Sequence, residues 1–325
     1  MRYGVTLPLP GVPPYAHRRI VEELPDLGYT DVWTGEAAGA DGFVPLALAA
    51  AWAPELHLGT AVVPVQTRGP ALLAMTAATL AGAAPGGFTL GIGSSGPPFV
   101  TATNGIPFER PYQRVRDTLR FLRAAFAGEY VAGDFGSFRI EGFQLAALPH
   151  PPPRLIVGAL RPGMLGLAGR EADGAATNFL AVEDVPAVVA ALGGGELMAR
   201  LFVCPTRDVT YARAVGRRLL APILNARTYS AFHDWLGRGE RLAPVRAAWA
   251  VGDRAGAQAA IPDDIVDALL VHGSPQECAA HVARYVAAGI DVPALALVPA
   301  PEFGGGPEAA REMVRRLSPA RVGVS

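Results

Sequence analysis

Three polar side chains stand where predicted strands end. Glu36 follows a strand at 31–34, Asn178 closes a strand at 175–179, and Glu302 follows a strand at 294–298. A carboxylate at such a position can donate or accept a proton during a reaction, and an amide can orient a polar substrate. Simpler roles compete: Glu36 could hydrogen-bond a nearby turn or a cofactor, Asn178 could only line a pocket, and Glu302 could be exposed to solvent. We expect catalytic candidates among these three.

A glycine-rich segment, 91–96, reads Gly-Ile-Gly-Ser-Ser-Gly after a predicted strand and matches the dinucleotide-binding pattern GxGxxG. In that motif the turn opens directly into a helix whose N-terminus faces the pyrophosphate. Here Pro97 and Pro98 follow, and no helix signal comes before Pro111. We therefore interpret the segment as a strand end where a flat ligand approaches and where Ser94 and Ser95 offer hydroxyl groups.

Other reactive side chains give weaker signals. The six histidines form neither an HExxH motif nor a cluster with cysteine, so we expect no metal site. Cys204 lies in an apolar strand and Cys278 in a helix, which predicts buried thiols. Tyr229, His233 and Trp235 could cover a substrate or, equally, pack a helix against the rest of the protein.

Short apolar runs alternate with amphipathic stretches of helical length, which is typical of βα units around a parallel sheet. A Ser-Pro-Gln-Glu capping box at 274–277 predicts a helix over Pro275–Ala288. The pattern predicts a single-domain (β/α)8 TIM barrel over 1–325. The eight predicted strands are Tyr3–Leu7, Asp31–Thr34, Leu56–Val63, Phe88–Ile92, Leu155–Ala159, Ala175–Phe179, Leu197–Cys204 and Ala294–Val298.

Two connections exceed what a minimal barrel needs. The first insertion, 96–150 after strand four, contains a Pro/Thr-rich loop, a helix from Pro111 and a hairpin-like stretch at 130–145. The second, 205–291 after strand seven, is mostly helical. Because loops after barrel strands lie on the C-terminal face, we expect both insertions to roof the pocket.

Composition excludes several classes of protein. The 325 residues carry a net charge of −1, and all 28 cationic side chains are arginine. No basic block is present, so nucleic acid and anionic membranes are not expected partners. The uncharged run 69–108 contains helix-compatible sequence only over 70–84, too short to span a bilayer, and the N-terminus lacks a signal-peptide pattern. We expect a cytoplasmic protein that acts on a small molecule.

Several motifs in order resemble the luciferase-like monooxygenase superfamily, and within it the coenzyme F420-dependent oxidoreductases. They cover most of the chain and are weakest over 205–267. The motifs are Leu58–Ala74, Gly87–Ser95, Pro107–Pro111, Gly158–Met164 with Ala168–Gly174, and Gly273–Glu277.

The resemblance implies a deazaflavin, coenzyme F420, lying across the barrel mouth. It implies a non-proline cis peptide bond between Ala61 and Val62, where a bulge backs the central ring. It also maps the ribityl and phosphate-bearing tail to two segments. The residues implied to bind the tail are Ser94 and Ser95 after strand four and Gly158, Ala159, Leu160, Arg161, Gly163 and Met164 after strand five, with Arg68 as a further possible cation.

One departure limits the analogy. Dehydrogenases of this branch close strand two with an acidic residue followed by histidine, but here Glu36 is followed by Ala37. The resemblance therefore implies hydride transfer between the deazaflavin C5 and a small organic substrate, and the departure at Ala37 disfavours a sugar phosphate as that substrate. The alternatives are an FMN-dependent luciferase-like monooxygenase and a non-catalytic flavin-binding barrel. The uncharged run and the apolar helix at 43–53 indicate a homodimer interface, which the resemblance also implies.

Overall fold

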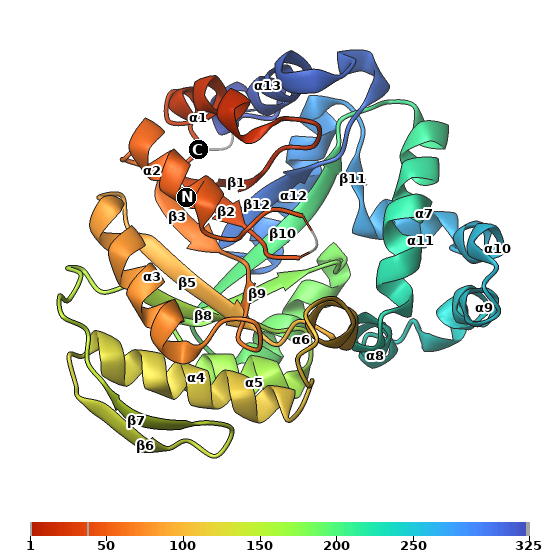
Figure 1. Ribbon diagram of the computed structural model, residues 1–325. Coiled ribbons are helices and arrows are strands. Elements are labelled where there is room, and N and C mark those ends of the chain that lie inside the picture. Colours follow the sequence, from red (N-terminus) through yellow and green to blue (C-terminus); the bar gives the residue numbers. More distant parts are fainter. Residues whose placement is uncertain (1, 38, 323–325) are drawn as a thin grey trace.

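A computed structural model describes residues 2–37 and 39–322. Eight parallel strands form a closed barrel, since β10 pairs with β9 on one side and β12 on the other. Helices surround the strands. The N-terminal and C-terminal parts of the chain lie close together near β1 (Figure 1). The barrel strands are β1 (Gly4–Leu7), β2 (Asp31–Thr34), β3 (His57–Thr60), β5 (Phe88–Gly93), β8 (Arg154–Gly158), β9 (Gly174–Asn178), β10 (Glu196–Cys204) and β12 (Val292–Leu297).

The predicted TIM barrel is confirmed, and each predicted strand is found to within a few residues. The third predicted strand is interrupted: β3 ends at Thr60, and the chain resumes as β4 (Val63–Pro64), which pairs with β5. A further short strand, β11 (Val271–His272), extends the sheet from the end of β10.

The helices begin and end at the residues that local signals favour. The Ser274 hydroxyl accepts a hydrogen bond from the Glu277 amide, and the Glu277 carboxylate accepts one from the Ser274 amide, which confirms the predicted capping box. Proline occupies the first turn of most outer helices, where its missing N–H leaves no helical bond unmade. The helices that cover the barrel are α1 (Arg18–Glu23), α2 (Val44–Trp52), α3 (Pro70–Ala83), α4 (Pro111–Phe126), α5 (Pro162–Glu171), α6 (Val185–Leu192), α12 (Pro275–Ala288) and α13 (Gly306–Arg316), followed by α14 (Pro319–Val322).

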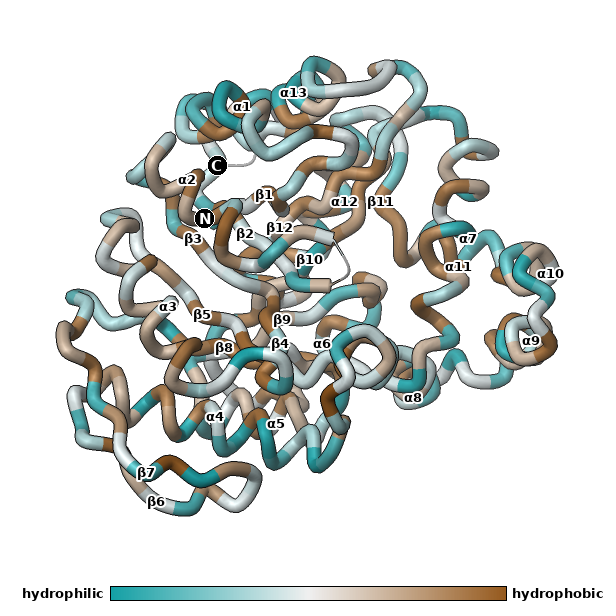
Figure 2. The backbone as a smooth tube through the Cα atoms, in the orientation of Figure 1, coloured by the Kyte–Doolittle hydropathy of each residue, from teal (hydrophilic) through white to brown (hydrophobic). Residues whose placement is uncertain are grey.

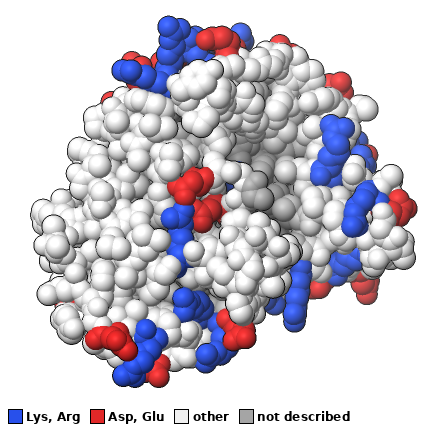
Figure 3. Space-filling model, viewed as in Figure 1, with Lys and Arg blue, Asp and Glu red and all other residues white. Residues whose placement is uncertain are grey.

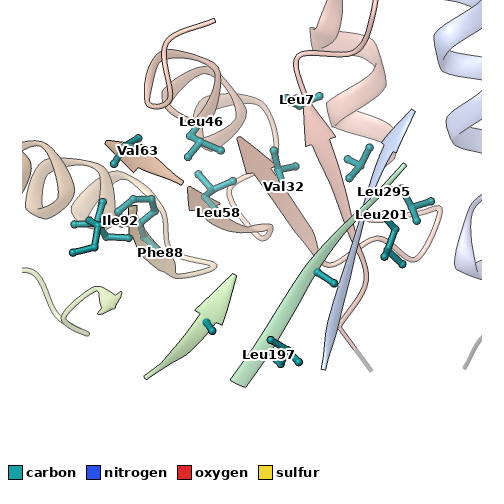
Figure 4. Close-up of a cluster of buried hydrophobic side chains, with 14 of the residues drawn as sticks. Leu7, Val32, Leu46, Leu58, Val63, Phe88, Ile92, Leu197, Leu201 and Leu295 are labelled. Atoms are coloured by element: carbon teal, nitrogen blue, oxygen red, sulfur yellow. The ribbon is translucent and has the colours of Figure 1, made fainter. Parts of the chain in front are cut away.

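Apolar side chains fill both the barrel and the layer between strands and helices. Leu46 of α2 points toward Val32 and Leu58 on neighbouring strands (Figure 4), and all three are fully buried. The hydropathy of the chain follows this layering, with brown concentrated on the strands and teal on outer helices and loops (Figure 2). Inside the barrel, a cluster fills the space between the strands: Trp33, Ile156, Ala176, Met198, Val292 and Ala294.

The first long connection only partly matches its predicted position. The strands β6 (Val131–Asp134) and β7 (Arg139–Phe143) form the expected antiparallel hairpin. The aromatic residues of the hairpin pack around Phe121 of α4, and Figure 1 shows the hairpin outside that helix. The hairpin therefore covers the outer side of α4, not the barrel mouth, which corrects the predicted roof. A short π-helix, Pro98–Thr103, lies nearer the strand end.

The second long connection forms a helical bundle with a core of its own. Its helices are α7 (Val209–Asn225), α8 (Arg227–Trp235), α9 (Gly239–Ala250), α10 (Arg254–Ala259) and α11 (Asp263–Leu269), whereas α12 belongs to the barrel. The bundle core includes Leu220, Leu242 and Ile265, and it continues into Phe179 and Phe202 at the strand ends. No helix in the described part of the chain is long and apolar enough to cross a bilayer.

Candidate active site

The interruption of the third strand forms a bulge at the barrel mouth. The peptide bond between Ala61 and Val62 is cis, as predicted. The Ala61 amide donates to the Thr34 carbonyl over 2.6 Å, and the Glu36 amide donates to the Val62 carbonyl over 3.1 Å. Both ends of the bulge are thus tied to the end of β2.

Two glycines make room for the Val62 side chain. A Cβ at Gly93 would lie 2.6 Å from Val62 Cγ2, and a Cβ at Gly158 would lie 3.0 Å from the same atom. At Gly91, a Cβ would lie 1.9 Å from the Thr60 carbonyl oxygen. Gly91 and Gly93, the first two glycines of the GxGxxG pattern, therefore allow Thr60 and Val62 to lie close to β5. This strand is part of the closed barrel and not of a dinucleotide-binding sheet. A short helix does begin soon after this segment, at Pro98, earlier than the sequence predicts.

The two serines follow β5 and are half-buried. The Ser94 hydroxyl donates to the Ser95 carbonyl at 3.3 Å, so part of its hydrogen-bonding capacity is used locally. Ser95 has a φ of 55°, a left-handed conformation that turns the chain sharply toward Gly96. The pair therefore shapes the turn and presents hydroxyl groups at the mouth.

The turn from β8 into α5 holds the other predicted cofactor contacts. Ala159 is buried, Leu160 and Met164 are half-buried, and Arg161 and Gly163 are exposed at the start of the helix. The Met164 and Leu165 amides both donate to the Arg161 carbonyl. A Cβ at Gly163 would meet nothing within 4 Å, so open space lies against the first turn. A helix N-terminus with free space beside it favours an anion.

Glu36 is bound in an ion pair at the mouth. Its carboxylate accepts from Arg68 Nη2 at 2.6 Å and from the Gly42 amide at 3.0 Å. Arg68 also pairs with Asp41, and these carboxylates, with Glu36 first, raise the pKa of the guanidinium. Arg68 is therefore paired with two carboxylates, and its contact with the cofactor tail stays a prediction. The contacts of Glu36 match the simpler of its two predicted roles, a hydrogen bond to a nearby turn.

The other two catalytic candidates have different surroundings. Asn178 ends β9, and its Oδ1 accepts a hydrogen bond from the Tyr229 hydroxyl of α8 at 2.9 Å. Glu302 is exposed in a short helix after β12, where it accepts a hydrogen bond from Thr206. Asn178 thus joins the barrel to the bundle at the mouth, while Glu302 joins the loops after β10 and β12.

The remaining predicted candidates of α8 are packing residues. His233 is fully buried, and burial with the charges of Arg238 and Arg246 lowers the pKa of its imidazole to about 3. Phe232 packs against Trp235. Cys204 and Cys278 are buried, as predicted, and burial raises the pKa of both thiols to about 12.

One side chain at the mouth was missed from the sequence. Arg200 is the single charged residue within the predicted strand Leu197–Cys204, and that isolation was the available signal. Its guanidinium lies over the Phe202 ring at 4.9 Å, and burial lowers its pKa.

Figure 3 shows a face that is mostly uncharged, with charged side chains around its edge and a small group of both signs near its centre. In residues 2–37 and 39–322, no three His, Cys, Asp or Glu side chains gather as metal ligands.

Comparisons with known proteins match this arrangement. The model of the luciferase-like monooxygenase family matches residues 2–292. A putative coenzyme F420-dependent oxidoreductase of Mycobacterium tuberculosis is 31% identical over 188 residues, which cover 54% of each chain. The alignment therefore spans about half the length of that relative.

Two solved structures share the fold. The coenzyme F420-dependent tetrahydromethanopterin reductase of Methanopyrus kandleri superposes with a TM-score of 0.77 at 20% identity, covering 97% of both chains. The oxygenating constituent of 3,6-diketocamphane monooxygenase from Pseudomonas putida, in complex with FMN, gives a TM-score of 0.67 at 16% identity, covering 100% of this chain and 98% of the other.

Proposed function

The chain belongs to the luciferase-like monooxygenase family, and on that premise we propose that it is a coenzyme F420-dependent oxidoreductase. The deazaflavin would exchange a hydride at C5 with a small organic substrate. The observation that carries the proposal is the break between β3 and β4 at the barrel mouth, where Val62 lies against Gly93 and Gly158, in a chain whose residues 2–292 match the family. The relative of Mycobacterium tuberculosis, named for the same cofactor, supports F420 over FMN.

The residues at the mouth fit such a cofactor. Val62 sits on the bulge and packs toward Gly93 and Gly158, so the backbone forms a firm wall for a flat ring. The hydroxyls of Ser94 and Ser95 lie at the end of β5 and can hydrogen-bond a polyol chain. Beyond them, the first turn of α5 offers free space and the positive end of a helix to a phosphate, with Arg161 exposed beside it.

Proton handling falls to few groups in this chain. Ala37 stands where related dehydrogenases place histidine, and it has no group to donate a proton. Glu36 is already bound to Arg68 and the Gly42 amide, which leaves it as a positioning residue for the loop after β2. Asn178, oriented by Tyr229, can hydrogen-bond a carbonyl or imine without transferring a proton. We infer that the enzyme reduces a conjugated substrate and that water supplies the proton.

A side-by-side titration tests the cofactor. Intrinsic tryptophan fluorescence is followed while F420 or FMN is added to the purified protein, and we expect micromolar binding of F420 with little response to FMN. The reverse preference would replace this proposal with an FMN-dependent monooxygenase. Absorbance of bound F420 is then followed as candidate substrates are added, and bleaching or recovery separates an enzyme from a barrel that only binds the cofactor.

A further inference from the structure

Arg200 points into the barrel at the height of the candidate site. On β10, Met198 belongs to the inner cluster, and side chains of a strand alternate between its two faces. Arg200 and Phe202 therefore share the inward face with Met198 and follow it toward the C-terminal end. Arg200 is in register with Asn178 of β9, two residue pairs beyond Met198 and Ala176 of the inner cluster.

This guanidinium has no anionic partner within the described residues. The Nε atom is enclosed by protein and makes no hydrogen bond, and none of the ion pairs in residues 2–37 and 39–322 includes Arg200. The carboxylate of the same strand, Glu196, is already paired with Arg2 and Arg154. A half-buried charge without a partner destabilises a fold, and an arginine cannot lose its charge at neutral pH. Such a residue is best explained by a ligand that supplies the missing charge.

The reach of Arg200 brings it to the bulge. Its Nη1 lies 3.7 Å from the position of a Cβ at Gly35, and the Ala61 carbonyl oxygen lies 3.2 Å from the same point. The side chain thus crosses the barrel from β10 to the ends of β2 and β3. The segments suited to the cofactor tail follow β5 and β8, so Arg200 enters from a different strand, β10, which β9 separates from β8.

Aromatic and amide groups surround the same place. Phe202 lies beneath the guanidinium and stacks on Phe179 with centroids 4.4 Å apart. Tyr229 meets Phe179 edge-on at 5.5 Å, and its hydroxyl orients Asn178. If a molecule bound with an oxyanion at Arg200, its apolar part would contact the rings of Phe179 and Phe202. A second polar atom could then hydrogen-bond the amide of Asn178.

We propose that Arg200 binds the carboxylate of the substrate, and that the enzyme acts on small organic acids with an apolar or aromatic body. That the bound carboxylate belongs to a substrate rests on the proposed function, whereas the anion site at Arg200 does not. Two oxygens of a carboxylate match the forked donors of an arginine. Removing a charge-assisted contact of this kind costs about tenfold or more in affinity.

The test uses sodium benzoate as the probe and benzamide as its uncharged counterpart of the same shape. Both are titrated calorimetrically into the purified protein, with and without saturating F420. We expect benzoate to bind at least about tenfold more tightly than benzamide, because only benzoate supplies the charge that Arg200 lacks. Equal binding of the two, or no binding of benzoate, would overturn the proposal.

Two variants locate the effect. Arg200→Met should lose at least about tenfold in benzoate affinity while its melting temperature stays equal or rises, because an unpaired charge is removed from a partly buried place. Arg18→Met, which removes an exposed arginine of α1, is the control and should bind benzoate as the parent does. If Arg200→Met fails to fold, Arg200→Gln takes its place.

The cofactor is measured separately in the same series. If the parent protein failed to bind F420, the proposed function would be wrong. The benzoate titration would still test the anion site at Arg200. If Arg200→Met lost F420 affinity and kept that for benzoate, Arg200 would belong to the cofactor and the organic-acid proposal would be wrong.

Discussion

At the scale of single residues, the candidate site depends on where side chains are absent. Gly93 and Gly158 leave the space that Val62 occupies, whereas Gly163 faces open space at the first turn of α5. The backbone at Gly163 is not in the left-handed region, so a side chain there meets neither strain nor a clash. Gly163 is therefore a position where a substitution reports on a bound molecule and leaves the fold unchanged.

Gly163→Asp should have opposite effects on stability and on cofactor binding. A carboxylate in the first helical turn favours the helix dipole by about 0.3–1 kcal/mol, so the melting temperature should stay equal or rise. The same charge would repel a phosphate in the open space, and we expect F420 affinity to fall by about tenfold. Fluorescence titration and thermal unfolding measure the two effects. Gly163→Asn is the uncharged control, and equal F420 affinity in both variants would mean that the tail lies elsewhere.

At the scale of elements, the first and last barrel helices are joined by one carboxylate. Glu23 at the end of α1 accepts hydrogen bonds from Arg311 and from Arg315 of α13, the latter at 2.9 and 3.0 Å. Hydrogen bonding from Arg311 and Arg315 outweighs burial and lowers the pKa of Glu23 from 4.5 to about 2. The ion pair thus closes the helical layer at the point where the barrel itself closes between β12 and β1.

The contribution of Glu23 should depend on pH. Because the folded state holds the pKa of Glu23 below its ordinary value, its stabilisation is full above 4.5 and is lost as the pH falls toward 2. Glu23→Gln should therefore unfold at lower urea concentration than the parent at pH 7, and the gap should narrow below pH 4.5. Glu22→Gln, on the same helix with the exposed partner Arg18, is the control and should cost less than about 0.5 kcal/mol. A gap for Glu23→Gln that stays constant down to pH 3 would contradict this account.

Elements and side-chain partners differ in how far the sequence predicts them. The eight strands and the helix at 275–288 follow from short apolar runs, prolines and a capping box, all of which act over a few residues. The ion pairs of Arg68 with Glu36 and Asp41, and the lack of an anionic partner for Arg200 among the described residues, depend on tertiary contacts between separate segments that no local pattern encodes. The hairpin was expected as an element, but its position against Phe121 is decided by tertiary packing.

At the scale of the whole molecule, one side of the barrel remains apolar where it meets solvent. The helices α2 and α3 contain no charged residue. Val44 is 59% exposed, and Leu72 and Met75 are each 48% exposed on one face of α3. Exposed apolar side chains that gather on neighbouring helices mark an interface more often than a free surface. We infer that this face is buried against a second copy of the chain.

Met75→Arg should therefore separate the two copies. An arginine placed in an apolar contact between copies would lose water without gaining a partner, and in a symmetric dimer the two new charges would also repel each other. Light scattering on a sizing column should give a mass of twice 33.8 kDa for the parent and about 33.8 kDa for the variant at micromolar concentration. Val251→Arg, at an 82% exposed position of the helical bundle, is the matched control and should keep the parent's mass. A parent protein that is monomeric, or a variant that remains dimeric, would mean that copies of the chain do not meet through α2 and α3.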